Sequence, residues 1–120
     1  MSDELPDINQ GILKPDLFEK FKMQLQKDFE NCGVDAAFCN TLKAEYDFIF
    51  HEIYTEVKRI TKSVNSKLNE LLYRIDISEL QIKKLSKEKP DVELEEVISE
   101  LIIKRELQKI VYKEFFKKHE

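Results

Sequence analysis

Residues 42–82 read LKAEYDFIFHEIYTEVKRITKSVNSKLNELLYRIDISELQI, a stretch that contains neither glycine nor proline. One apolar pattern recurs along it every 11 residues. Its positions are Leu42, Tyr46, Ile49, Ile53, Val57, Ile60, Val64, Leu68, Leu71, Ile75, Glu79 and Ile82, of which only Glu79 is charged. A repeat of 11 residues corresponds to about 3.67 residues per turn, so these side chains follow a nearly straight stripe along a helix. The stretch therefore predicts a very long central helix with one face to bury.

A shorter helix is predicted before this stretch. Pro15 suits a first helical turn, because the missing N–H of proline has no partner there in any case. The apolar residues that share one face of this helix are Phe18, Phe21, Leu25, Phe29 and Cys32. Gly33 ends it, since glycine adopts the left-handed conformation that closes many helices, and Asp35 is the expected N-cap of the central helix. We expect a flexible N-terminal lead over residues 1–13 and a single helical domain over 14–120.

The last predicted helix, of medium length, runs from about residue 91 to 117. Pro90 disfavours helix at the residue before it, and the acidic residues after Asp91 suit the positive end of a new helix. Its apolar residues form two groups: Leu94, Val97, Ile98 and Leu101 with Tyr112, Phe115 and Phe116, and Ile103, Leu107, Ile110 and Val111. Because a helix with two apolar faces has two faces to cover, this one predicts two neighbours.

These lengths predict an assembly. A continuous central helix of about 51 residues spans roughly 75 Å at 1.5 Å per residue. Short connections make the two other helices antiparallel neighbours that each cover one end of it. Two helices cannot enclose a core, so we expect a homodimer with a four-helix cross-section. The alternative is a monomeric four-helix bundle with a break at residues 61–66, which are poor in helix formers. The unbroken phase of the repeat favours the continuous helix.

The composition is typical of a helical protein, with 42% hydrophobic and 37% charged residues but only two glycines and three prolines. No apolar run approaches the ~18 residues of a membrane span, and the first residues lack the pattern of a secretory signal. We therefore expect a cytoplasmic protein. In that compartment Cys32 and Cys39 are expected to be reduced thiols that pack as small hydrophobic side chains.

The sequence carries no recognisable catalytic pattern. Its only glycines, Gly11 and Gly33, are too far apart to form a phosphate-binding loop. Neither His51 nor His119 lies three residues after a glutamate, as the histidines of di-iron helical bundles do. We therefore expect no enzyme activity, no cofactor, no metal and no small-molecule ligand.

The function that the sequence favours is a non-catalytic helical scaffold or adaptor that self-associates and presents a helix surface to a protein partner. The candidate partner-binding residues lie away from the face set by Leu94 and Leu101. They are Ile102, Ile103, Leu107, Ile110 and Val111.

The alternative function is the binding of an anionic surface, nucleic acid or membrane, through a basic ridge on the last helix. The ridge recurs every four residues as Arg105, Lys109, Lys113 and Lys117. Glu106 and Glu114 are interleaved with it, and cations are favourable near the end of any helix. A solvated helix end explains this pattern well, so nucleic acid or membrane is the less favoured partner.

Overall fold

Five α-helices and one short 3-10 helix make up the part of the chain described by the computed structural model, residues 15–118, with side chains described as far as Glu114. They are α2 (Pro15–Asn31), the 3-10 helix η1 (Ala37–Thr41), α3 (Tyr46–Lys62), α4 (Leu68–Ile75), α5 (Glu79–Glu88) and α6 (Leu94–Lys118). No strand occurs in this range, so the predicted all-α class is confirmed. The predicted lead over 1–13 lies outside the described residues.

The prediction of one long central helix is wrong. The helix breaks where the alternative placed it, because α3 ends at Lys62 and α4 begins at Leu68. Ser63 is extended, with φ −74° and ψ 152°, and its hydroxyl donates to the main-chain oxygen of Ile60 at 3.1 Å. Such local bonds offer the backbone an alternative to the helix. Val64, which the repeat placed on the buried stripe, is 99% exposed.

A second break follows α4, at Asp76, where the sequence predicted no turn. Asp76 takes the left-handed conformation with φ 76°. Its N–H donates to the main-chain oxygen of Tyr73 at 3.1 Å, and the N–H of Ile77 donates to that of Leu72 at 2.9 Å. These two bonds form a Schellman motif, which ends a helix by satisfying its last carbonyl groups.

The next helix, α5, begins at a capping box. The N–H of Gln81 donates to the hydroxyl of Ser78 at 3.2 Å, and the N–H of Ser78 donates to the side chain of Gln81 at 2.8 Å. Because this exchange satisfies two N–H groups that a helix start leaves unpaired, it stabilises a new helix rather than a continuation of α4.

The predicted end of the first helix is confirmed. Gly33 has φ 76°, and its N–H donates to the main-chain oxygen of Glu30 at 2.9 Å while that of Val34 donates to Phe29 at 3.0 Å. This is a second Schellman motif. The prediction of Asp35 as the N-cap of the central helix is wrong, because Ala36 is the N-cap of η1 and Glu45 that of α3. Asp35 instead accepts a hydrogen bond from the N–H of Ala37 at 2.9 Å in the turn before η1.

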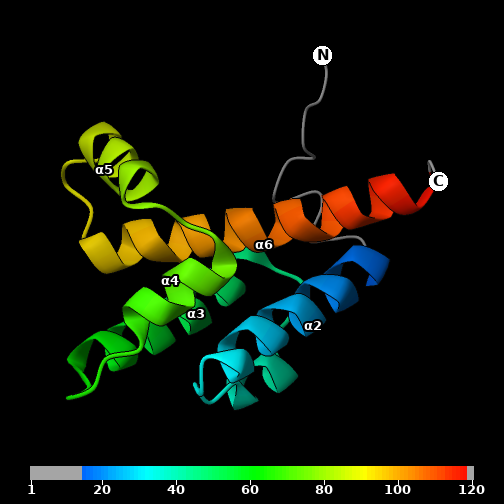
Figure 1. Cartoon of the computed structure of the whole chain (residues 1–120), viewed down its shortest axis with the longest axis horizontal. Helices are drawn as coiled ribbons and strands as arrows, with labels where there is room; N and C mark the ends of the chain where they lie inside the picture. Colours follow the sequence, from blue (N-terminus) through cyan, green and yellow to red (C-terminus); the bar gives the residue numbers. More distant parts are fainter. Residues whose placement is uncertain (1–14, 119–120) are drawn as a thin grey trace.

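The core forms around α6, which lies between α5 on one side and α2, α3 and α4 on the other (Figure 1). Its fully enclosed side chains include Phe21, Leu25, Phe29, Ile49, Ile53, Val57, Leu71, Ile75, Val97, Ile102 and Ile103. A single chain therefore hides the apolar faces for which the sequence analysis required a second copy. The physical reason for expecting a homodimer no longer applies. No helix within residues 15–118 is both long and apolar enough to cross a membrane.

Candidate functional site

The side chains predicted to bind a partner lie inside the fold. Ile102 and Ile103 are 0% exposed, Leu107 and Ile110 are 3% exposed, and Val111 packs, partly buried, against the same core. They are buried because α6 has neighbouring helices on more than one side. They therefore do not form the exposed face that the prediction requires, although Ile110 contributes to the wall of a groove described below.

The predicted basic ridge is tied to neighbouring elements. Its hydrogen bonds run from Arg105 to Asp76 at 2.8 Å, from Lys109 to Asp28 at 2.8 Å and from Lys113 to Gln24 at 2.6 Å. The side chain of Lys117 lies outside the described residues. The three described cations therefore do not form a free ridge for an anionic surface. Lys109 and Lys113 instead contact side chains of α2.

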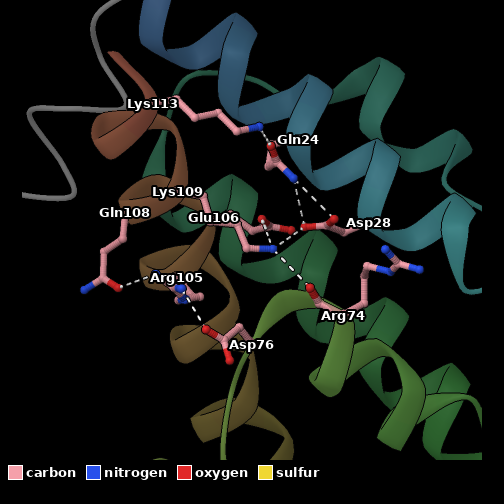
Figure 2. Close-up of polar contacts among 9 residues, drawn as sticks. All are labelled: Gln24, Asp28, Arg74, Asp76, Arg105, Glu106, Gln108, Lys109 and Lys113. Carbon is pink, nitrogen blue, oxygen red and sulfur yellow. Dashed lines mark hydrogen bonds and ion pairs between the residues drawn. The ribbon is translucent and has the colours of Figure 1, made fainter. Parts of the chain in front are cut away.

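A polar network occupies this interface (Figure 2). Gln24 and Asp28 are one turn apart on α2 and only 8% and 3% exposed. The side-chain amide of Gln24 donates to both carboxylate oxygens of Asp28 at 3.2 Å, and Lys109 donates to one of them at 2.8 Å. Lys109 also donates to the main-chain oxygen of Arg74 at 3.2 Å. Asp28 thus has the cation and the donors that a buried carboxylate requires.

Glu106 lies beside Asp28 without such partners. It is 0% exposed, and neither of its carboxyl oxygens accepts a hydrogen bond from the described residues. The ammonium of Lys109 lies 3.7 Å from its Oε1. Burial, and then the neighbouring Asp28, raise the pKa of Glu106 to about 9. Glu106 is therefore a neutral acid at pH 7, and its O–H can donate to Asp28, toward which Figure 2 shows it directed.

A groove of about 360 Å3 opens between α2 and α6 beside this network. It is lined by Lys20, Met23, Gln24, Lys27, Ile110, Lys113 and Glu114. Lys20 forms an ion pair with Glu114 at 2.6 Å, whereas Lys27 has no ion pair with a described side chain. Met23 is 70% exposed. Gln24 and Lys113 belong both to the groove wall and to the buried network, so hydrogen bonds join the groove to Asp28. We call Asp28 and its neighbour Glu106 the acid pair.

A second groove, of about 290 Å3, lies between α5 and α6. Leu85 and Leu101 contribute its apolar part, and Lys84, Lys104, Arg105 and Glu88 contribute charge. None of the side chains of α5 is fully buried. Because no buried network leads into this groove, the groove between α2 and α6 is the stronger candidate site.

The two cysteines are free and buried, as the sequence predicted for reduced thiols. Burial raises the pKa of the Cys32 thiol and raises that of Cys39 to about 12. Both thiols are therefore neutral at pH 7 and poor nucleophiles. Within the described part of the chain, no three histidine, cysteine or acidic side chains gather as a metal site would require.

Compared with known proteins, the chain matches no family model, no curated protein and no solved structure. Its class is therefore defined by its own fold and site. It is an all-α, single-chain globule with a lysine-rich groove between α2 and α6.

Proposed function

We propose that this protein is a non-catalytic helical adaptor that binds an acidic, partly apolar segment of a protein partner in the groove between α2 and α6. The observation that carries the proposal is the lining of the groove, where Lys20, Lys27 and Lys113 surround Met23 and Ile110 and outnumber the one acid, Glu114, which pairs with Lys20. Ammonium groups favour carboxylates, and the flexible thioether of methionine packs against apolar side chains of varied shape.

The size of the groove favours a short segment of a partner. A volume of about 360 Å3 accommodates a few side chains, and an open channel between two helices suits an amphipathic helix that inserts only its apolar face. Lys27 is exposed and carries no internal ion pair with the described side chains, so its ammonium is available to a partner.

The position of the acid pair favours binding over catalysis. Glu106 has the chemistry of a general acid, but it is fully enclosed and does not line the groove. A catalytic acid must come within hydrogen-bond distance of its substrate. Glu106 contacts Asp28 and Lys109 instead, which suits a structural and electrostatic role beneath the groove.

The proposal is tested with a labelled amphipathic helical peptide that carries leucine on one face and glutamate beside it, measured by fluorescence anisotropy. The groove variant is Lys27→Glu, and the matched control is Lys104→Glu, the same charge change on the exposed side of α6. We expect Lys27→Glu to weaken binding about tenfold or more and Lys104→Glu to change it little, because the introduced carboxylate repels the peptide only in the groove. Equal losses in both variants would contradict the proposal.

Two further probes separate the proposed partner from other anions. A peptide with every glutamate replaced by lysine is expected not to bind. Duplex DNA and vesicles rich in phosphatidylserine are expected to bind more weakly than the acidic peptide at physiological salt. Tighter binding of DNA or vesicles, insensitive to Lys27→Glu, would favour an anionic surface as the partner and would overturn the proposal.

A further inference from the structure

Two carboxyl groups meet between α2 and α6, under the proposed binding groove. Asp28 is 3% exposed and Glu106 is 0% exposed. Ionising both groups places two negative charges side by side in a medium that stabilises charge poorly. Neither oxygen of Glu106 accepts a hydrogen bond from the described residues, and the ammonium of Lys109, 3.7 Å from Oε1, is shared with Asp28, so a second charge there is only partly compensated.

We propose that Glu106 keeps its proton, hydrogen-bonded to Asp28, while the groove holds an anionic segment, and that loss of this proton weakens the binding. This inference rests on the proposed function. It adds a regulating element to the same site, namely a buried acid that sets the charge beneath the lysines.

The cations that face Glu106 are shared with other acids. Lys109, on the same helix, already donates to Asp28 of α2, and Arg105 pairs with Asp76 at 2.8 Å. Cys39 of η1 is a neutral thiol, and α4 contributes the main-chain oxygen that Lys109 contacts, while the guanidinium of Arg74 interacts with Cys32 of the loop after α2. The residues that α3 buries in the core are all apolar. A second carboxylate in this position therefore adds a negative charge that Lys109 and Arg105 compensate only in part.

A negative charge on Glu106 affects anion binding in the groove in two ways, through the hydrogen-bond network and through direct electrostatic repulsion. Asp28 accepts from Gln24, whose side-chain oxygen accepts from Lys113 at the groove. Glu106 and Lys113 are two turns apart on α6, roughly 10 Å along the axis. At the effective dielectric constant of a partly buried site, a unit charge at this distance changes the affinity for an anion roughly tenfold. Anion binding is therefore strong while Glu106 is protonated and falls as the pH rises through its pKa of about 9.

The test is isothermal calorimetry with the acidic peptide described above, from pH 7 to 9.5, on the wild-type chain and on Glu106→Gln. The amide of glutamine keeps the size of the side chain and a donor for Asp28 but cannot ionise. At pH 9.5 about three-quarters of Glu106 is ionised, so we expect the wild-type affinity to fall about threefold over this range and that of Glu106→Gln to fall much less. Glu88→Gln, an exposed acid on α5, is expected to follow the wild-type profile.

A second readout is the uptake of protons. At pH 9, in two buffers with different ionisation enthalpies, the wild-type chain is expected to take up as much as about half a proton on binding, because the anion favours the protonated acid. The glutamine variant is expected to take up almost none. If Glu106→Gln does not fold, proton uptake by the wild-type chain alone still tests whether binding is coupled to protonation of a buried acid.

The outcomes separate the two claims. If the peptide does not bind at any pH, both the proposed function and this inference fail. If it binds with the same pH profile and proton uptake in the wild type and in Glu106→Gln, the groove is a binding site and only the coupling to Glu106 is wrong.

Discussion

Lys109 on α6 donates a hydrogen bond of 2.8 Å to Asp28 on α2, although the two residues are 81 positions apart in the sequence. The Asp28 side chain is 4% exposed and that of Lys109 is 17% exposed, so the ion pair belongs to the interior. Gln24, one turn from Asp28 on α2, accepts from Lys113 of α6 at 2.6 Å, so two polar contacts hold α2 along α6. The groove and the buried acid pair both depend on these contacts.

Replacing Lys109 with methionine is expected to lower the free energy of unfolding by about 3 kcal/mol, because it leaves a buried carboxylate without its cation. Urea denaturation at pH 7, followed by circular dichroism, measures this loss. Lys104→Met, at an exposed position of the same helix, is expected to stay within about 0.5 kcal/mol of the wild type. Equal stabilities of the two variants would show that Lys109 does not compensate Asp28.

Glu106 makes the stability of the wild-type chain depend on pH. Its folded pKa of about 9 lies above the ordinary value of glutamate, so between about pH 5 and 9 the unfolded chain has lost a proton that the folded chain keeps. Stability from this group is present in full at acid pH and falls by at most about 1.4 kcal/mol per pH unit toward pH 9. Urea midpoints at pH 5.5, 7 and 8.5 are expected to decline for the wild type and to decline less for Glu106→Gln. Parallel curves would contradict a neutral Glu106.

Asp76 ends α4 in a left-handed conformation, with φ 76°, that glycine adopts without strain. Asp76→Ala is therefore expected to be less stable than Asp76→Gly, by about 1 kcal/mol. Both variants lose the carboxylate that pairs with Arg105, so their difference isolates the backbone effect. Thermal unfolding of the two proteins measures it, and equal midpoints would count against the turn described here.

The purified chain is expected to be a monomer, because its large apolar faces are already covered by its own helices. Size-exclusion chromatography with light scattering should give a mass of 14.3 kDa. A mass twice as large at micromolar concentration would restore the homodimer that the sequence alone suggested.

The helical class and several helix ends could be predicted from local chemistry, whereas the path of the chain between helices could not. Gly33 and Asp76 end helices with the same motif. Only the glycine predicts a helix end from sequence, because aspartate adopts the left-handed conformation less often. Ser78 with Gln81 offered a usable signal for the start of α5. The 11-residue repeat stayed in phase on both sides of the break, so periodicity could not distinguish one long helix from two packed ones. Val64, in phase yet 99% exposed, lies in that break.

The acid pair was missed because each half of it resembles a surface residue. Glu106 is interleaved with lysines, but it also lies three residues after Ile103 and four before Ile110, which places it on a buried face of α6. That spacing could have identified Glu106 as a buried acid. Its partner could not be identified, because no local pattern states that α2 packs against α6.

The protonation state of Glu106 is measured most directly by following the carbon-13 chemical shift of its side-chain carboxyl between pH 4 and 10. Uniformly labelled wild-type protein serves for this, with the signal assigned by its loss in Glu106→Gln. The structure predicts a carboxyl that is protonated at pH 7 and titrates near pH 9. Titration of Glu106 below pH 6 would contradict the buried acid pair, and with it the regulation proposed for the groove.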